Sequence, residues 1–376
     1  MKICFVVNEC NFFYSHRFEL AKKLTNLGEV FLITDCEDTE QKIIKDISEA
    51  KIKIHPIQKR LSRKGVQGFI FYFFSLIGAI NHIKPSTIFF VTLEISFIGV
   101  FISWFKRKIN CFYLITGFGP FLYKKSLKHR FLYFLHKIAF LTIRKNPNSK
   151  FIFQNIEDKN IFIKDGFASR KNSILIHGSG INMNKIHFNK RGGIKSISFL
   201  FASRLVNAKG VGEFIQAGRE IKNIFPNVNI SVAGKYDSND PDSISEKLFL
   251  EIQDSSNINY LGEISIDAMQ ESFLNYDIFV LPSHGEGLPK AAIEAAASGM
   301  PLILSSVSGC KECLNNNENG LLIEKKNVES IKSAMEWMIL NQSEIPKMSA
   351  ASRKFIEEKF SIEKIFNSYK KLLILK

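Results

Sequence analysis

Short apolar runs of strand length alternate with helix-length segments along the whole chain, and this alternation limits the folds open to it. A strand, a helix and a second strand in succession form a parallel pair, because the crossover helix returns the chain to the same edge of the sheet. The pattern therefore predicts the α/β class with parallel sheets. The first series of runs comprises 2–7, 29–34, 52–56, 87–92, 112–116 and 151–154, and the second comprises 197–201, 228–233, 277–281, 301–305 and 321–323.

A polar stretch separates the two series. Residues 183–195 contain Gly192-Gly193 and are typical of a linker. We therefore expect one doubly wound, Rossmann-like domain over 1–182 and a second over 196–360, with a cleft between them as the ligand site. A last helix over 361–376 is expected to pack back on the N-terminal domain.

Positive charge is concentrated in the first half of the chain. Residues 51–150 hold 18 Lys and Arg and a single acid, Glu94, whereas residues 186–376 hold 22 Lys and Arg against 23 Asp and Glu. A field of one sign attracts an anionic partner, which could be nucleic acid, anionic lipid or a polyphosphate substrate. Nothing in the chain resembles an RNA-reading motif, so no nucleic-acid partner is expected.

Neither of two apolar segments is expected to span a membrane. Residues 68–80 number only 13, and the 20 residues of 86–105 contain Glu94 and fit a strand followed by a helix. Basic residues precede the aromatic-rich runs 69–74 and 131–135, a pattern typical of contact with an anionic membrane surface. The alternative for either run is a solvated basic face over an ordinary core helix. The basic residues are Lys59, Arg60, Arg63 and Lys64 before the first run, and Lys124, Lys125, Lys128 and Arg130 before the second.

The six cysteines and the possible metal ligands indicate no cofactor. The chain opens on a β-like run rather than a signal peptide, so reduced thiols in the cytoplasm are the simplest interpretation. Cys310-x-x-Cys313 lacks a second pair at zinc-finger spacing. The acidic stretch 237–242 has the composition of a loop. We expect no metal site.

The most specific stretch is 281–301, where a strand, a Gly-rich turn and a helix follow one another. Glu286 lies in the turn, Pro289 stands at the expected helix start, and Glu294 lies on its first turns. A helix N-terminus offers backbone N–H groups and the positive end of a dipole, which suit a phosphate. At about 1.5 Å per helical residue the carboxylates stand roughly 10 Å apart, the scale of a sugar nucleotide. The alternative is a helix-capping acid beside a surface acid.

The E-x7-E spacing of Glu286 and Glu294 resembles that of the family 4 retaining glycosyltransferases, which have the two-domain GT-B fold. The resemblance covers essentially the whole chain and is strongest in its C-terminal half. In the N-terminal half it is similar to the branch that builds capsule, O-antigen and lipid-linked oligosaccharides. The other stretches that carry the resemblance are 12–17, 116–119, 153–155, 176–182, 199–210 and 231–234.

The resemblance implies a donor site in the C-terminal domain. Arg204 and Lys209 would clamp the donor diphosphate, and two fixed cations can neutralise the charge that develops on a leaving diphosphate. Glu286 would bind hydroxyls of the donor sugar, which completes the expected catalytic set. The other expected donor-binding residues are Gly287 and Leu288 at the phosphate, Glu294 at the ribose, and Gly262 and Glu263 at the base.

The N-terminal domain departs from the family in two places. The Gly-Gly turn that many relatives have after the first strand is replaced by residues 8–12, and the histidine that many carry at the cleft is missing near Thr116. No general base is therefore assigned, although retaining enzymes of this type are thought to use the leaving phosphate itself. His284 either contacts substrate or only shapes its turn. The acceptor-side candidates are Asn11, His16, Arg17, Thr116 and Gly117.

Together these features predict a retaining, metal-independent glycosyltransferase. It would move a hexose or N-acetylhexosamine from a UDP-sugar to a polyprenyl-diphosphate-linked saccharide in bacterial O-antigen or capsule assembly. The basic N-terminal domain would face the acceptor and the inner face of the cell membrane, with the protein cytoplasmic and peripheral. Two alternatives stay open: a UDP-sugar epimerase of similar fold, and a non-catalytic basic membrane-binding protein.

Overall fold

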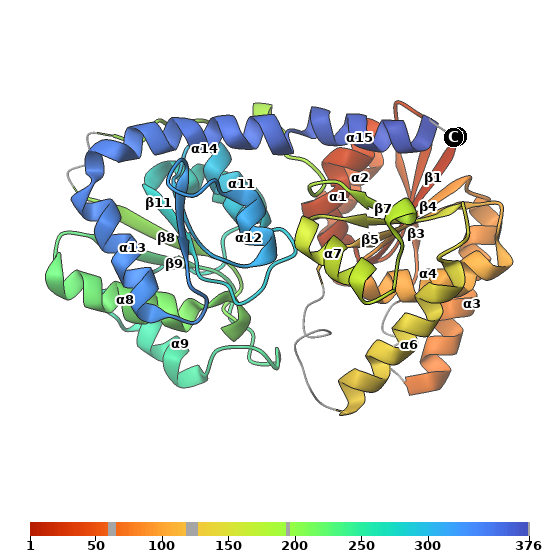
Figure 1. The fold of residues 1–376 in the computed structure, drawn as a ribbon, viewed down its shortest axis with the longest axis horizontal. Helices are drawn as coiled ribbons and strands as arrows, with labels where there is room; N and C mark the ends of the chain where they lie inside the picture. The colour runs from red at the N-terminus through yellow and green to blue at the C-terminus, as the bar shows by residue number, and fades with distance from the viewer. Residues whose placement is uncertain (59–64, 118–126, 193–195, 375–376) are drawn as a thin grey trace. The chain divides into compact units, whose positions relative to one another are not determined.

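The computed structural model describes residues 1–58, 65–117, 127–192 and 196–374 and divides the chain into two units. Residues 1–180 and 362–376 form the first unit, and residues 181–361 form the second. Figure 1 shows a sheet flanked by helices in each unit. Both belong to the predicted α/β class and have the predicted Rossmann-like form of parallel sheets covered by helices.

The first unit contains a seven-stranded sheet in the order β3-β2-β1-β4-β5-β6-β7, and every neighbouring pair is parallel. Alternate residues of β1 point to opposite faces, as the strand period requires. Ile3 and Phe5 therefore enter one hydrophobic cluster, while Cys4 and Val6 enter the other. The strands are β1 (Lys2–Glu9), β2 (Glu29–Asp35), β3 (Ile52–Pro56), β4 (Thr87–Val91), β5 (Asn110–Ile115), β6 (Ser149–Phe153) and β7 (Ser173–Leu175).

Helices cover both faces of this sheet. The apolar residues of α1 (Cys10–Leu24), α2 (Gln41–Glu49) and α15 (Ile362–Ile374) join the cluster on one face. The opposite face is covered by α3 (Gly65–Ile83), α4 (Leu93–Phe105), α6 (Leu127–Ile143) and α7 (Ile156–Lys164). A short 3-10 turn, η2 (Arg170–Asn172), leads into β7.

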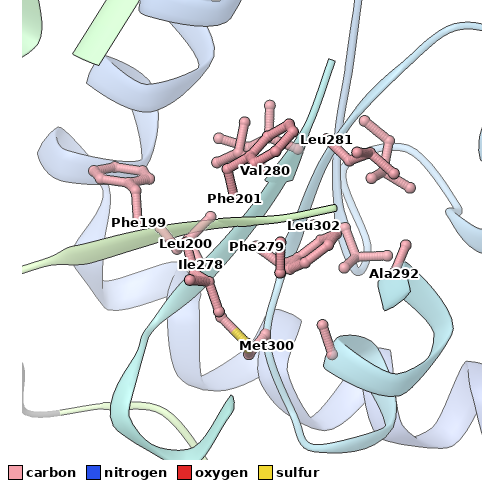
Figure 2. Packing of buried hydrophobic residues seen from close by; sticks show 14 of the residues in the cluster. Phe199, Leu200, Phe201, Ile278, Phe279, Val280, Leu281, Ala292, Met300 and Leu302 are labelled. Carbon is pink, nitrogen blue, oxygen red and sulfur yellow. The ribbon is translucent and has the colours of Figure 1, made fainter. Parts of the chain in front are cut away.

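The second unit contains a six-stranded parallel sheet in the order β10-β9-β8-β11-β12-β13. Figure 2 shows its centre, where side chains of the two middle strands, among them Phe199 and Phe279, are surrounded by apolar neighbours. The strands are β8 (Ser198–Ala202), β9 (Asn229–Ala233), β10 (Asn259–Tyr260), β11 (Ile278–Leu281), β12 (Leu302–Ser305) and β13 (Gly320–Ile323). The helices are α8 (Val211–Ile224), α9 (Glu246–Gln253), α10 (Ile266–Ser272), α11 (Lys290–Ala297), α12 (Ser308–Cys313), α13 (Val328–Leu340) and α14 (Ile345–Phe360), with 3-10 turns η3 (Met183–Lys185), η4 (Asn207–Lys209), η5 (Phe273–Asn275) and η6 (Gln342–Glu344).

The stretch predicted as a linker differs from the prediction in its described part, 183–192. These residues fall inside the second unit rather than between the units. Arg191 is 3% exposed, and its guanidinium donates to the carbonyl oxygens of Tyr276 at 2.8 Å and Ser298 at 3.2 Å. A polar, Gly-containing composition predicted a linker, but the backbone carbonyls of the second unit bind this arginine and hold the stretch against it.

No helix in the part of the chain that the structure describes is both long and apolar enough to cross a membrane. The apolar segment around residue 95 is divided between β4 and α4, as the sequence predicted.

Candidate functional site

The strand order of the second unit reverses between β8 and β11, so the loops that follow these two strands diverge from one point. In open α/β sheets ligands bind at this reversal, at the carboxyl ends of the strands. The two loops touch: the backbone N–H of His284 donates to the Ala208 carbonyl at 2.8 Å. Gly210 has a φ of 72°, and a Cβ there would overlap the Pro282 carbonyl oxygen. Only glycine fits this position, which brings the loops close together.

Lys209 and Glu286 meet where these loops converge. The Lys209 Nζ lies 2.5 Å from Glu286 Oε1, and the two side chains are 22% and 9% exposed. A charge-assisted hydrogen bond with this little solvent is stronger than a surface pair. The structure thus brings together two of the three residues that the resemblance identified as catalytic.

The backbone of the Glu286 turn is supported from below by α12. Gly309 N–H donates to the Glu286 carbonyl at 3.0 Å, and a Cβ on Gly309 would come within 2.6 Å of that oxygen. Cys310 and Cys313 lie on the same helix and are fully buried, and burial raises the pKa of both thiols well above the ordinary range. Both side chains pack in the hydrophobic cluster of the second unit.

Glu294 lies on α11, in the helix that follows the Glu286 turn. Its Oε1 lies 2.9 Å from Lys290 Nζ in an ion pair, and its side chain is 12% exposed. Lys290 was not among the predicted residues, although its position four residues before Glu294 gives the i,i+4 spacing of such a pair. Gly287 and Leu288 lie between the two acids, just before the helix begins. The turn and the helix that follows it therefore carry one carboxylate each, and each is paired with a lysine.

Arg204 is placed differently from Lys209. It follows β8 in the same loop, but its side chain is 67% exposed and its Nη1 lies 2.9 Å from Asp240 Oδ2. No contact joins it to Lys209 or Glu286 among the described residues. An exposed pair of this kind is worth at most about 1 kcal/mol, so a more highly charged anion can replace Asp240 as the partner of Arg204.

Gly262 and Glu263 follow β10, two strands away from β8. Gly262 has a φ of 71° and its carbonyl accepts from the Gly234 N–H at 2.8 Å. A Cβ on Gly262 would meet no atom within 4 Å, so the backbone there borders open space. Glu263 is exposed, and its charge adds to burial in raising the pKa of Tyr260. At about 4.8 Å per strand, this loop lies roughly 10 Å from the β8 loop.

His284 has a structural partner. Its Nε2 lies 2.8 Å from Glu213 Oε1 in the first turn of α8. Together with its backbone bond to Ala208, this contact ties the loop after β11 to the loop after β8. Of the two interpretations of His284, the geometry favours the one in which it shapes the turn.

The acceptor-side candidates on α1 do not form one cluster. Asn11 is exposed and its amide donates to the Asp38 carbonyl at 3.1 Å, while His16 is half-buried and stacked on Phe12 with ring centroids 4.3 Å apart. Arg17 is 2% exposed. It faces Tyr369 of α15, and burial lowers its pKa. Arg17 therefore does not face a substrate, because the helical repeat that buries Phe13 and Leu24 also buries it.

Thr116 and Gly117 follow β5 directly and are half-buried. The rest of their motif, 118–119, lies outside the described residues, as do the basic residues at 59–64 and 124–125. Both described residues stand at the carboxyl edge of the sheet, where ligands of parallel sheets bind.

Sequence reasoning missed a polar cluster where the strand order of the first unit reverses, between β1 and β4. The Asn8 amide donates to Glu94 Oε2 at 3.0 Å. Thr92, the residue before α4, has a φ of 82°, which is a strained conformation for a β-branched residue. Asn8 Oδ1 and Thr92 Oγ1 are buried and have no hydrogen-bond partner among the described residues. Strain and unsatisfied polar atoms together are typical of functional sites.

No group of three or more His, Cys, Asp or Glu side chains in 1–58, 65–117, 127–192 and 196–374 could hold a metal ion.

Comparison with known proteins identifies relatives of this chain. Residues 183–355 match the sequence model of the family Glycosyl transferases group 1, and this range spans nearly all of the second unit. The capsular polysaccharide biosynthesis glycosyltransferase CapM of Staphylococcus aureus is 28% identical over 262 residues, or 66% of this chain and 67% of CapM.

A second relative covers both units. The N,N'-diacetylbacillosaminyl-diphospho-undecaprenol alpha-1,3-N-acetylgalactosaminyltransferase of Campylobacter jejuni is 27% identical over 90% of this chain and 89% of that protein. Among solved structures, Anabaena HepE in complex with UDP and glucose superposes with a TM-score of 0.78 over 99% of each chain at 15% identity. That likeness concerns the fold.

Proposed function

We propose that this chain is a GT-B glycosyltransferase, as the match of residues 183–355 to Glycosyl transferases group 1 supports, and that it moves a hexose or N-acetylhexosamine from a UDP-sugar to a lipid-linked saccharide. The observation that carries the proposal is the Lys209–Glu286 pair at the strand-order reversal of the second unit. It joins a cation suited to a diphosphate with a carboxylate suited to sugar hydroxyls, where parallel sheets bind ligands.

The donor would lie across the loops after β8, β10 and β11. Lys209 and Arg204 would bind the diphosphate, Glu286 the sugar hydroxyls, and Glu294 the ribose, with the base near Gly262 and Glu263. The backbone N–H groups at the start of α11, together with Gly287 and Leu288, would add hydrogen bonds to phosphate oxygens. The Lys209 ammonium has three N–H donors, so Lys209 can bind a phosphate oxygen and Glu286 at the same time.

The transfer breaks the bond between the sugar anomeric carbon and the diphosphate oxygen, and the electron pair leaves with UDP. The acceptor hydroxyl oxygen bonds to the same carbon, and its proton passes to the leaving diphosphate. Arg204 and Lys209 stabilise the charge that develops there. We propose a retained anomeric configuration and no metal requirement, since the two cations supply what a divalent ion would otherwise provide.

The acceptor would bind the first unit. Asn11, His16, Thr116 and Gly117 remain candidates there, and Asn8, Thr92 and Glu94 join them because their polar atoms lie at the strand-order reversal. The Campylobacter relative supports a saccharide on undecaprenyl diphosphate as the acceptor class, because its name states one and it matches 90% of this chain. The name of CapM supports a role in bacterial capsule assembly, within the capsule and O-antigen branch that the sequence resembles.

A lipid-linked acceptor would place the enzyme at a membrane. Large apolar side chains are exposed on three neighbouring helices of the first unit, which Figure 1 shows below its sheet. A patch of this kind marks an interaction surface, and the excess of Lys and Arg in residues 51–150 suits an anionic bilayer. We therefore propose a cytoplasmic protein attached peripherally to the inner face of the membrane. This apolar surface comprises Phe69, Ile70, Phe71 and Phe74 on α3, Trp104 and Phe105 on α4, and Phe131, Leu132, Phe134, Ile138 and Leu141 on α6.

The test is a donor-panel assay with purified protein, detergent and a short lipid-diphosphate saccharide. UDP release that depends on the acceptor, persists in EDTA and is lost in Glu286→Ala supports the proposal, and the anomeric proton coupling of the product reports retention. Isomerised nucleotide sugar without acceptor would instead favour the epimerase. Absence of binding to any nucleotide sugar would favour the non-catalytic membrane-binding alternative.

A further inference from the structure

A cavity of about 700 Å³ opens in the first unit beyond the C-terminal end of α6. Its lining includes Ser149, the first residue of β6, and Asn172, which immediately precedes β7. Parallel strands all begin at the same edge of their sheet, so the cavity lies at the amino edge. Glu94 and Thr116 follow strand ends at the opposite, carboxyl edge. The cavity is therefore separate from the proposed acceptor site.

The cavity is lined by cations. Arg144, Lys145, Lys150 and Lys171 contribute to its wall, and no carboxylate among the described residues does. None of the four forms an ion pair with another residue of the described ranges. Four cations around one hollow repel each other, and a polyanionic oxygen cluster such as phosphate would relieve that repulsion.

The backbone that carries these cations is fixed by hydrogen bonds. Asn172 donates to the Arg144 carbonyl at 3.3 Å, and a capping box between Ser169 and Asn172 sets the turn that holds Lys171. Asn148 donates to the Arg107 carbonyl at 2.8 Å, which joins the end of α4 to the loop before β6. The cavity is thus preformed, and a ligand could bind without the cost of ordering its backbone.

The cavity adjoins the apolar surface. Leu141 belongs to both, since it is exposed on α6 and lines the cavity wall. Thr142, also in the wall, accepts a hydrogen bond from Trp104 Nε1 at 2.8 Å, so the exposed end of α4 is held beside it. Phe105 follows and is 73% exposed. Apolar side chains next to a basic hollow match the two parts of a phospholipid.

We propose that this cavity binds the headgroup phosphate of an anionic phospholipid whose acyl chains contact the apolar surface. Guanidinium and ammonium groups bind phosphate oxygens by charge-assisted hydrogen bonds, and the volume falls in the range of small-molecule sites. The inference rests on the proposed membrane contact but not on the transfer reaction. It adds selectivity for a headgroup to what would otherwise be general attraction to a charged surface.

Vesicle flotation tests this site. Wild-type protein is expected to bind phosphatidylcholine vesicles that contain phosphatidylglycerol more tightly than pure phosphatidylcholine vesicles. Each cation near an anionic surface contributes roughly fivefold to affinity, so Lys145→Ser/Lys150→Ser/Lys171→Ser should lose on the order of 100-fold. Lys370→Ser/Lys371→Ser/Lys164→Ser removes three exposed lysines of the same unit outside the cavity and should lose much less. Equal losses in the two variants would overturn the proposal.

Two further arms separate the possible sources of phosphate and the two proposals. Inorganic diphosphate is added at constant ionic strength. If it abolishes the preference of the wild-type protein for phosphatidylglycerol vesicles, and the protein binds it as tightly as it binds those vesicles, the site takes free phosphate and the lipid assignment is overturned. UDP binding by calorimetry should be unchanged in the triple cavity variant, because its mutated residues lie in the first unit. Loss of headgroup preference with intact UDP binding supports the cavity site, whereas failure of wild-type UDP binding contradicts only the proposed function.

Discussion

The strand order reverses in both units, but the polar side chains at the two reversals differ in how many hydrogen-bond and ion-pair partners they have. In the second unit Lys209 neutralises Glu286, and Gly210 lets the two loops touch. In the first unit Thr92 adopts a strained φ of 82°, and polar oxygens of Asn8 and Thr92 are buried without partners among the described residues. The same strand arrangement thus carries a site whose charges are paired in the second unit and a site whose polar atoms lack hydrogen-bond partners among the described residues in the first. An incomplete site can complete its hydrogen bonds with the hydroxyls of a neutral saccharide.

The largest effect is expected at the completed site. Glu286→Gln should lower kcat/KM by about 10²–10³-fold, since it weakens hydrogen bonds to the reacting sugar and removes the charge that positions Lys209. UDP release in the donor assay measures this. Glu251→Gln is the matched control, because its exposed pair with Arg219 is 3.3 Å long and contributes little. Similar losses in both variants would mean that Glu286 has no specific part in the transfer.

A pair of glycine substitutions measures how closely the second unit is fitted together. Gly210→Ala should lower the free energy of unfolding by about 3 kcal/mol or more, because strain at a φ of 72° combines with a clash at Pro282. Gly262→Ala has nearly the same φ, 71°, but open space around its Cβ, so it should cost only about 1–2 kcal/mol. Denaturant midpoints decide this. Equal costs would show that the loop contact at Pro282 is unimportant.

A buried acid in the first unit should make its stability depend on pH. Burial raises the pKa of Asp158, at the start of α7, from 3.8 to about 6. The folded state therefore favours the protonated carboxyl, and this contribution to stability is full only below pH 3.8 and is lost as the pH rises through about 6. The loss is at most about 3 kcal/mol. Asp158→Asn should flatten this part of the curve of unfolding free energy against pH, and an unchanged curve would contradict the assignment.

A substitution of Glu94 tests whether the polar site of the first unit, with Asn8 and Thr92, binds the acceptor. Glu94→Gln should raise the KM for the saccharide acceptor by about tenfold while the KM for the UDP-sugar stays the same, since one charged hydrogen bond to a hydroxyl becomes neutral. Steady-state kinetics with each substrate varied separately tests this. Glu49→Gln, an exposed acid of α2, serves as control. A change in the donor KM alone would place Glu94 outside the acceptor site.

The smallest effect is expected at Arg17. Its Nε and Nη1 are buried without a hydrogen-bond partner among the described residues, and Tyr369 is the group that faces it. Replacing a poorly compensated buried cation with an apolar side chain of similar length is often neutral or stabilising. Arg17→Met should therefore raise the free energy of unfolding by up to about 1 kcal/mol. A fall of several kcal/mol would show that Arg17 has a stronger partner.

The sequence predicted local features better than tertiary ones. The strand–helix alternation predicted both sheets except the short strands β7 and β10, because each longer strand depends on its own apolar pattern. The Glu286–Glu294 turn was recognisable because its residues are close in sequence. The Lys209–Glu286 contact joins residues 77 apart and was expected only as a shared site. Arg191 was hidden in a polar stretch, since its partners are backbone carbonyls that no composition reveals.

In the first unit two signals were available but were not used. Arg17 recurs at helical spacing with buried residues, which would have placed it in the core. Glu94 is the only acid among residues 51–150 and follows a predicted strand end, which is the position of a ligand-binding residue in a parallel sheet. The strain at Thr92 could not have been predicted, because it depends on how α4 joins β4 in three dimensions.

The first unit is interrupted by the whole of the second, and this affects the order of folding during synthesis. Residues 181–361 leave the ribosome before 362–374, whose Tyr369 packs edge-on against Phe89 in the centre of the first sheet, 5.5 Å between ring centroids. The second unit then has all its residues while the first still exposes the groove that α15 fills. A nascent chain stopped at residue 361 should therefore resist protease in its second unit and be cleaved in its first, the reverse of the usual N-terminal-first order.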